Sequence, residues 1–152
     1  AELIPERYPR YLMGIGTPEY ILEAVEQGID MFDCVFPTRT ARNAQAFTTR
    51  GPLSLKTEAC KLDQQPIDPD CSCSTCRSYS RAYLRHLFKT KEILAAMLTT
   101  QHNLAFIQNL VVSVRQAIAE GHFRRFKEQY LDRYGQRGVG KKQKNDESAG
   151  AF

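Results

Sequence analysis

Hydrophobic and polar positions near the start of the chain follow a strand pattern, then a helix pattern, then a strand pattern again. The short apolar run Tyr11–Met13 ends at glycines and predicts a strand. Thr17 then offers a helix cap with Pro18 in the first helical position, and apolar residues follow at spacings of three and four up to Gly28. The nearly all-apolar run 31–36 predicts a strand buried on both faces, as in a parallel sheet with helical crossovers. This order of elements predicts an α/β fold.

The rest of the chain consists of a long polar connection followed by helices. Residues 38–70 show little regular pattern apart from a short hairpin around Arg50–Pro52, and a connection of this length usually carries function. Apolar positions at helical spacing predict helices over about 78–88, 91–99, 102–120 and 123–134. Residues 136–152 lack a core-forming pattern, and we expect them to form a disordered tail.

Composition and charge narrow the class of protein. The chain has 152 residues, of which 42% are hydrophobic and 25% charged, and this suits about one domain with a buried core. A net charge of +4 is compatible with an RNA partner without establishing one. No apolar run approaches the ~20 residues of a membrane span, and the N-terminal residues lack a signal-peptide pattern. We therefore expect a cytoplasmic protein that does not enter a membrane.

Three of the five cysteines, Cys71, Cys73 and Cys76, lie within six residues. Without a secretion signal, this clustering indicates metal binding before disulfides, and three thiolates at this spacing can hold one tetrahedral Zn²⁺ ion. The fourth ligand is left open among His86, His102, His122 and Cys60. The position of His102 at the start of a predicted helix favours it only slightly. Such a closed site would stabilise the fold and not catalyse, and the alternative is a group of free or redox-active thiols.

Asp33 lies near the carboxyl end of the second predicted strand, where active sites of barrel and open α/β folds gather. A buried carboxylate needs a partner, a ligand or a chemical role, and a salt bridge to a nearby arginine is the alternative to a catalytic function. The segment Thr38–Arg42 follows closely and carries two guanidinium groups, which suit phosphates or base edges of a nucleic acid. An ordinary solvated loop is the other interpretation of that segment.

Three motifs, in this order, resemble tRNA-guanine transglycosylases: GIDMFDCVFPTR at 28–39, CxCxxC at 71–76 and SRAYLRHL at 80–87. The similarity extends from about Tyr8 to Tyr134. Members of this family are (β/α)8 barrels with a zinc subdomain inserted after the last barrel strand. They exchange the guanine at the wobble position of certain anticodons for a deazaguanine, preQ1 in bacteria or queuine in eukaryotes. The implied fold class is α/β, the C-terminal part of a (β/α)8 TIM barrel with an inserted zinc-binding subdomain and closing helices.

The resemblance also implies roles for individual residues. It places the nucleophile on Asp33 and the methionine that packs on the bound base on Met13. The implied ligands of one structural Zn²⁺ ion are Cys71, Cys73, Cys76 and His102. The implied tRNA-binding residues are Gly14, Ile15, Gly16, Thr17, Pro18, Glu19 and Tyr20, together with Thr38, Arg39, Thr40, Ala41 and Arg42. Asp33 would attack the ribose C1′ and hold the tRNA covalently while the bases exchange.

The resemblance further implies a division of the chain and a set of partners. Residues 1–59 would supply the last strands, a helix and the active-site loop of the barrel, residues 60–103 the zinc subdomain, and residues 104–135 the closing helices. A complete barrel needs about 250 residues. We therefore expect a C-terminal portion of a larger enzyme, inactive alone, whose second catalytic aspartate and base-reading residues lie upstream.

The expected partners are a tRNA with a GUN anticodon, the preQ1 or queuine base, with preQ1 favoured, and a second copy in a homodimer. Two alternatives come from other functional classes. One is a non-catalytic subunit that binds tRNA or a catalytic partner, and the presence of Asp33 and of Thr38–Arg42 argues against it. The other is a free-standing zinc module, and the strand residues 11–36 argue against that.

Overall fold

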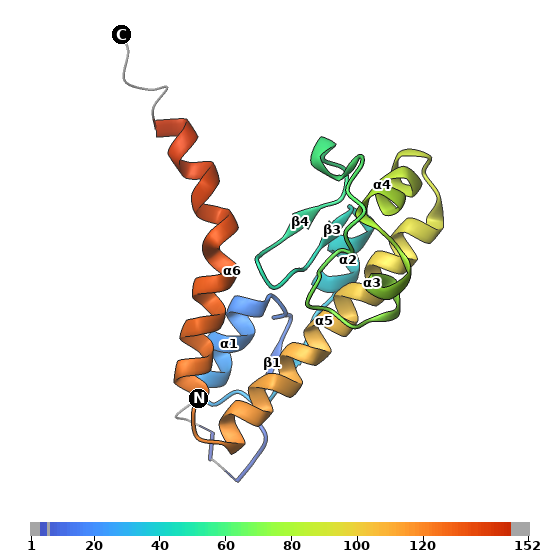
Figure 1. Ribbon diagram of the computed structural model, residues 1–152. Helices are drawn as coiled ribbons and strands as arrows, with labels where there is room; N and C mark the ends of the chain where they lie inside the picture. Colours follow the sequence, from blue (N-terminus) through green and yellow to red (C-terminus); the bar gives the residue numbers. More distant parts are fainter. Residues whose placement is uncertain (1–3, 6, 147–152) are drawn as a thin grey trace.

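The computed structural model of the chain describes residues 4, 5 and 7–146, with side chains through residue 135 (Figure 1). Its elements are β1 (Tyr11–Met13), α1 (Pro18–Glu26), β2 (Met31–Asp33), α2 (Phe36–Arg42), β3 (Gln45–Ala46), β4 (Leu53–Ser54), the 3₁₀ helix η1 (Glu58–Cys60), α3 (Ser74–Ser78), α4 (Arg81–Lys89), α5 (Ile93–Ala119) and α6 (Phe123–Asp146). The 27-residue helix α5 contacts α1, α2, α3, α4 and α6. It is therefore the element around which the others are arranged.

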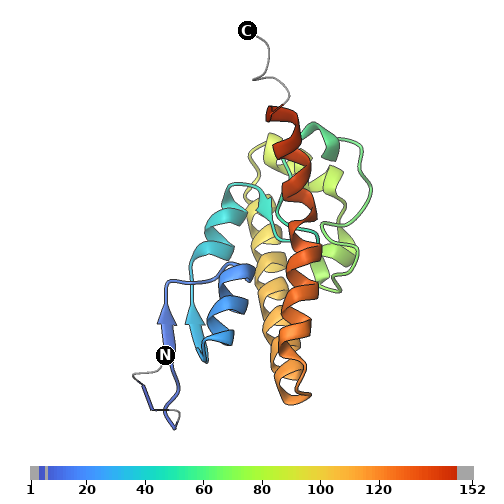
Figure 2. The same ribbon diagram turned by 90° about the vertical axis from the view of Figure 1, so that its left-hand side faces the viewer.

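The strand–helix–strand prediction for the first part of the chain is confirmed. Strands β1 and β2 pair in parallel, and α1 connects them. The side chain of Thr17 caps α1 by accepting a hydrogen bond from the backbone N–H of Tyr20 at 3.4 Å. Figure 2 shows the two strands at one edge of the molecule with α1 beside them.

The second strand is shorter and less buried than predicted. β2 ends at Asp33, and Met31 at its start is 46% exposed, so the expectation of burial on both faces is wrong. The apolar run continues into α2, which begins at Phe36 and has Pro37 in its first turn. Proline has no backbone N–H to donate. It is therefore compatible both with the end of a strand and with the first turn of a helix, where no N–H is required. The residues of α2 are thus helical, where the sequence suggested an irregular connection.

Three further differences concern the connection and the later helices. The predicted hairpin exists, but it pairs Gln45 with Ser54 and Ala46 with Leu53. The two helices expected over 91–99 and 102–120 form the single helix α5, in which no glycine or proline interrupts the turns. Helix α6 continues past Gly135 to Asp146, where a disordered tail was expected, because extending an existing helix costs little per residue. Residues 147–152 of that expected tail lie outside the described residues.

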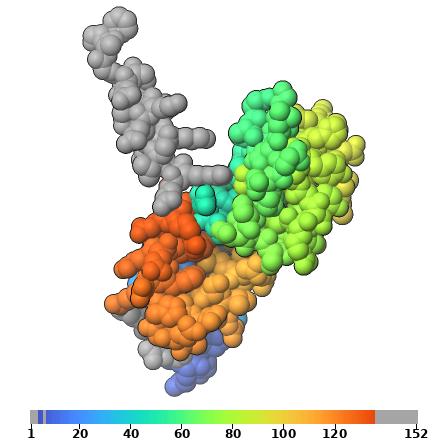
Figure 3. All heavy atoms as spheres, viewed as in Figure 1, coloured from blue at the N-terminus to red at the C-terminus, as the bar shows by residue number. Residues whose placement is uncertain are grey.

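The buried side chains form two clusters along α5. The metal-side core packs the N-terminal half of α5 against the hairpin, α3 and α4, and comprises Ala44, Ala46, Leu55, Ile67, Cys76, Leu84, Leu87, Ala95 and Leu98. The sheet-side core packs the C-terminal half against α1 and α6, and comprises Leu22, Phe47, Phe106, Leu110, Val114, Tyr130 and Tyr134. Figure 3 shows the residues around the metal-side core as one green lobe beside the orange α5–α6 region. Across the described part of the chain, no helix is both long enough and apolar enough to span a bilayer.

Candidate metal centre and active-site carboxylate

Cys71, Cys73, Cys76 and His102 each direct one ligand atom toward a common point. The three sulfurs and the imidazole nitrogen lie within 4.8 Å of one another. The Nδ1 atom of His102 is 3.2 Å from Sγ of Cys76 and 3.5 Å from Sγ of Cys73. In a tetrahedral zinc site with ordinary bond lengths, nitrogen and sulfur ligands are about 3.5 Å apart. The donor set and its spacing therefore fit a closed site for one metal ion.

The local structure that brings the ligands together begins at Cys73, the N-cap of α3. Its sulfur accepts a hydrogen bond from the backbone N–H of Cys76 at 3.4 Å, so the two thiols lie one helical turn apart on the same side. The hydroxyl of Thr75, which is fully buried, donates to the carbonyl of Leu98 at 2.9 Å. This contact fixes α3 on α5 one turn before His102.

The orientation of the imidazole ring is set on its other side. Nε2 of His102 donates to the backbone carbonyl of Phe47 at 2.7 Å, and the ring is fully buried. A metal-binding histidine commonly donates its second ring N–H to a carbonyl or a carboxylate, which fixes the tautomer that presents the free nitrogen to the metal. The hydrogen bond to Phe47 thus leaves Nδ1 available as a ligand.

The charges within the cluster are strongly coupled. The hydrogen bond with Cys76 lowers the pKa of Cys71 to about 3, and the same contact raises the pKa of Cys76. Burial alone would lower the pKa of His102, but hydrogen bonds with Cys71 and Cys73 raise it to about 9. Thiolates gathered around one imidazole concentrate negative charge, and a divalent cation neutralises that charge when it binds.

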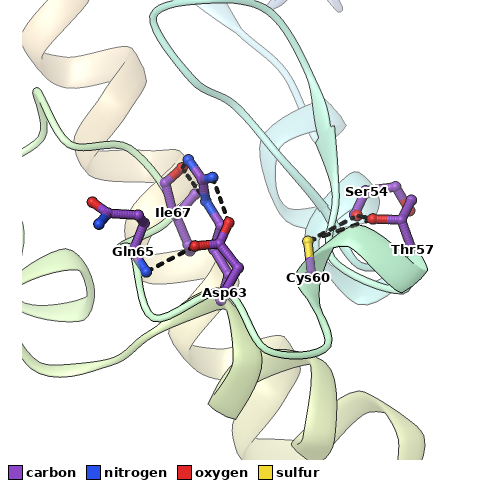
Figure 4. Close-up of polar contacts among 7 residues, drawn as sticks. Ser54, Thr57, Cys60, Asp63, Gln65 and Ile67 are labelled. Atoms are coloured by element: carbon purple, nitrogen blue, oxygen red, sulfur yellow. Dashed lines mark hydrogen bonds and ion pairs between the residues drawn. The ribbon is translucent and has the colours of Figure 1, made fainter.

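The other candidate fourth ligands lie elsewhere. Figure 4 shows Cys60 with its thiol directed at Ser54 and Thr57; its Sγ is 3.7 Å from the Ser54 carbonyl and 3.4 Å from the Thr57 hydroxyl. His86 is exposed on α4, and His122 pairs with Glu120 at 3.4 Å. Of the four candidates, only His102 joins the cluster within the described residues.

The loop that leads to the first cysteine is fastened to α4. Arg81 Nη1 donates to the Asp63 carboxylate at 2.8 Å, and Arg81 Nη2 donates to the Ile67 carbonyl at 2.9 Å (Figure 4). The same carboxylate accepts the backbone N–H of Gln65 at 2.9 Å. These contacts hold the chain between η1 and the cysteines against the helix that follows them.

Asp33 ends β2 directly opposite Met13, which ends β1. The carboxylate was expected to be buried, but it is exposed, because its strand end opens to solvent. Its Oδ1 atom accepts hydrogen bonds from the Tyr11 hydroxyl and from the backbone N–H of Gly14, the latter at 3.3 Å. No lysine or arginine among the described side chains pairs with Asp33, so the salt-bridge alternative is not observed.

Tyr11 is the residue of this site that sequence reasoning missed. Its hydrogen bond to Asp33 raises its pKa above the ordinary value of 10.0, and the hydroxyl therefore stays protonated and donates. A signal was present, because residues two apart in a strand share a face and Tyr11 lies two residues before Met13. The missing information was the register that places Met13 against Asp33.

The first predicted RNA-binding segment, 14–20, forms the turn after β1 and the first turn of α1. Gly14 adopts a positive φ of 77°, which suits glycine. A Cβ atom on Gly16 would lie 2.3 Å from the Cβ of Cys34, so the turn packs closely on the residue after Asp33. Pro18 is buried, whereas Tyr20 is 62% exposed. The segment therefore borders the end of β2 through Gly16, and its last residue exposes an aromatic ring on α1.

The second predicted RNA-binding segment, Thr38–Arg42, lies in α2 and is not a solvated loop. Ala41 is fully buried, while Arg39 and Arg42 are exposed. Residues three apart share a helix face, and neither guanidinium forms an ion pair with the described residues. The helix therefore presents two exposed cations on one side.

Comparison with known proteins places this arrangement in a family. The sequence profile of the queuine tRNA-ribosyltransferases matches residues 1–136. The chain is 52% identical over 134 residues to the queuine tRNA-ribosyltransferase of Treponema denticola, an alignment that covers 88% of this chain and 35% of that protein. It is 54% identical over 134 residues to the enzyme of the same name from Helicobacter acinonychis, covering 88% of this chain and 36% of that protein.

The enzyme of that name from Aquifex aeolicus is 54% identical over 132 residues, covering 87% of this chain and 35% of that protein. The chain thus spans about a third of the length of the curated relatives that it matches. The resemblance inferred from three short motifs is confirmed over nearly the whole sequence. The chain belongs to the queuine tRNA-ribosyltransferase family.

Proposed function

We propose that this chain is the C-terminal part of a tRNA-guanine transglycosylase, which replaces the wobble guanine of GUN anticodons by preQ1. The observation that carries the proposal is the pair formed by Asp33 and Met13 at the carboxyl ends of two parallel strands. Active sites of β/α barrels lie at that end of the strands. The family membership and the strand–helix–strand unit support a (β/α)8 barrel to which β1 and β2 contribute.

The chemistry proposed for Asp33 is a double displacement at the ribose. A carboxylate oxygen attacks C1′ of nucleotide 34, the C1′–N9 bond breaks, and guanine leaves with the electron pair on N9 and takes up a proton. The incoming base, deprotonated at N9, then attacks C1′, breaks the bond to Asp33 and regenerates the carboxylate. Two inversions give net retention, as in retaining glycosidases. Water must be kept from C1′ while the tRNA is held covalently.

The contacts of Asp33 are suited to this role. Both hydrogen bonds, from Tyr11 and from the Gly14 N–H, reach the same oxygen, Oδ1. No hydrogen bond from the described residues reaches Oδ2, so Oδ2 is the oxygen available to attack while the two donors restrain the carboxylate. Met13 is 75% exposed across from it, so its thioether is available to pack on a bound base.

The tRNA would lie across the turn 14–20 and helix α2. Arg39 and Arg42 offer exposed guanidinium groups for phosphates of the anticodon loop, close along the chain to the nucleophile. The cluster of Cys71, Cys73, Cys76 and His102 would hold Zn²⁺, which contributes folding energy to this lobe and takes no part in the base exchange. The complete barrel, the second catalytic acid and a homodimer belong to the same proposal, as does the inactivity of this chain alone.

The decisive experiment measures incorporation of radiolabelled guanine into a tRNA with a GUN anticodon. The full-length enzyme that carries this chain, its Asp33→Asn variant and its Asp30→Asn variant are compared. Asp30 is a matched control, because it is an exposed aspartate of the same segment that accepts the Arg10 backbone N–H at 2.7 Å. We expect Asp33→Asn to lose at least about a thousandfold in rate and Asp30→Asn to stay near the parent rate.

A second readout tests the covalent step. A tRNA adduct that survives a denaturing gel should form with the parent and with Asp30→Asn, but not with Asp33→Asn. Exchange that persists in Asp33→Asn would refute Asp33 as the nucleophile. Tight tRNA binding without exchange in the parent would instead support a non-catalytic subunit.

A further inference from the structure

Two consecutive polar residues of α5, His102 and Asn103, lie at the junction of the metal-side and sheet-side cores. Both side chains are fully buried. On α5 the metal-side core ends at Leu98, and the sheet-side core begins at Phe106. A buried polar pair between two apolar clusters is costly unless every donor and acceptor is satisfied. The hydrogen-bond partners of His102 and Asn103 therefore identify the segments that are fastened to α5 at this junction.

The amide of Asn103 is bound by groups of a single segment, 37–47, which include the Thr40 hydroxyl of α2 at 3.4 Å from Nδ2. Its Nδ2 atom donates to the carbonyls of Pro37 and Gln45, each at 3.0 Å. Its Oδ1 atom accepts the backbone N–H of Phe47, also at 3.0 Å. Asn103 thus fastens the first turn of α2 and the strand that follows α2 to one point on α5.

His102 also binds Phe47, from the side of the metal centre. Its Nε2 donates to the Phe47 carbonyl, so neighbouring side chains of α5 hold both the N–H and the C=O of Phe47. The Phe47 ring stacks on Phe36 at the start of α2, with centroids 5.9 Å apart, and lies 5.9 Å from the ring of Phe106 on α5. A metal ion that fixes the His102 ring therefore also fixes the segment 36–47.

We propose that Asn103 is a positioning residue that acts together with His102 of the metal centre to hold α2, and with it Arg39 and Arg42, in place relative to Asp33. The proposal rests on the proposed function for the part that α2 plays in tRNA binding. It extends the metal centre's effect beyond the stability of its own lobe. When the metal is absent or the amide of Asn103 is removed, α2 loses its fixed place while β2 keeps its pairing with β1.

The first test follows amide hydrogen exchange of residues 36–47 in the Zn²⁺-loaded chain. Asn103→Leu removes all four hydrogen bonds of the amide at nearly constant volume. Asn103→Asp keeps an acceptor for the Phe47 N–H but removes the Nδ2 donor. Asn109→Leu is the matched control, because Asn109 is exposed on the same helix. We expect about tenfold faster exchange in α2 for both Asn103 variants, with one Zn²⁺ still bound per chain.

Removal of Zn²⁺ from the wild-type chain should accelerate exchange of the same segment by at least as large a factor, because Ala44 and Ala46 of that segment belong to the metal-side core. This measurement needs no variant to fold, so the proposal stays testable if Asn103→Leu does not. Unchanged protection of residues 36–47 after metal removal would overturn the proposal. Unchanged protection in an Asn103 variant that retains zinc would do the same.

The second test separates this inference from the function it rests on. In the full-length enzyme, Asn103→Asp should raise KM for tRNA about tenfold and leave kcat within about threefold, because α2 binds the RNA while Asp33 performs the chemistry. A fall in kcat alone would overturn the assignment of Asn103 to positioning. If α2 loosens in the exchange experiment but the parent enzyme does not modify tRNA, the coupling stands and the proposed function fails.

Discussion

The metal-side and sheet-side cores share α5 but hold their polar groups in different ways. Around the metal-side core the polar groups are buried and paired: Asp68 is 1% exposed and accepts the Thr49 backbone N–H at 2.7 Å and its hydroxyl at 3.2 Å. On the sheet side, α1 is tied to α6 by Lys127, which lies 2.7 Å from Glu23 and 2.5 Å from Glu26. Strands β1 and β2 carry exposed side chains at both ends.

The metal-side lobe therefore contributes mainly stability, whereas the sheet region carries the carboxylate proposed to react. A lobe with buried, saturated polar groups and four converging metal ligands can specify its own structure. A two-stranded sheet is marginal by itself and gains stability when further strands or helices cover it. Asp33 lies in the second region. The carboxylate proposed to react therefore depends on neighbours for its setting, whereas the metal centre does not.

The largest effect should come from removing a metal ligand. Metal binding contributes on the order of 10 kcal/mol to small zinc-dependent folds, which is comparable to the whole stability of a domain. We expect Cys76→Ser to lose zinc and to unfold the metal-side core, as measured by metal content and by hydrogen exchange in α3 and α4. Cys60→Ser is the matched control, because Cys60 is a buried cysteine outside the cluster. Equal metal content in both variants would contradict the ligand assignment.

The residues of the metal centre show what the sequence alone could predict. The three cysteines are close along the chain, so their spacing revealed them. His102 lies 26 residues beyond Cys76, and only the family resemblance selected it before the structure did. Asn103 gave no signal, because a polar residue inside a predicted helix is usually exposed. Its role depends on backbone groups more than 50 residues away in sequence.

The sheet region shows a second limit. Periodicity located β1, α1 and β2, and the parallel pairing was expected. The true end of β2 and the start of α2 could not be predicted, since Pro37 is compatible with either a strand stop or a helix start. Burial of Asp33 was inferred from apolar neighbours in sequence. Burial is set by which elements cover a strand, and that depends on tertiary structure.

A pair of truncations should sharpen the comparison between the two cores. Leu84 on α4 is fully buried in the metal-side core, and Met31 on β2 is 46% exposed. Leu84→Ala should lower the free energy of unfolding of the zinc-loaded chain by about 2–5 kcal/mol. Met31→Ala should change it by about 0.5 kcal/mol or less. Urea denaturation measures both free energies of unfolding. Similar losses for the two variants would mean that the metal-side core and the sheet region do not differ in this way.

Tyr11→Phe should separate chemistry from stability. The substitution removes one hydrogen bond to the exposed Asp33 carboxylate and leaves the ring in place. The Tyr11 hydroxyl orients the carboxylate proposed to attack, so we expect kcat of the full-length enzyme to fall about tenfold. KM for tRNA and the melting temperature should stay unchanged. Tyr8→Phe is a suitable control, since Tyr8 is 53% exposed outside β1, and a shift in melting temperature for Tyr11→Phe alone would assign Tyr11 a structural role instead.

The smallest effect concerns pH and the contact between α1 and α6. The hydrogen bond from Lys127 lowers the pKa of Glu26 below its ordinary value of 4.5. A carboxyl group whose pKa is lower in the folded state stabilises the fold above its unfolded pKa, and this contribution is lost as pH falls through the folded pKa. The difference in urea midpoint between wild type and Glu26→Gln should therefore be present at pH 6 and shrink as pH falls below 4.5. Acid release of metal affects both proteins alike and cancels in the difference.

Salt gives an independent check of the same contact. Salt screens an ion pair that solvent can reach, and the Glu26 side chain is 29% exposed, so 1 M NaCl at pH 6 should also reduce the difference between wild type and Glu26→Gln. Glu128→Gln serves as the control, because Glu128 is exposed on α6 and forms no ion pair among the described side chains. A difference in urea midpoint that does not shrink as pH falls below 4.5, and that high salt leaves unchanged, would mean that Glu26 acts through packing. The contact between α1 and α6 would then depend on apolar packing and on the remaining Lys127–Glu23 pair.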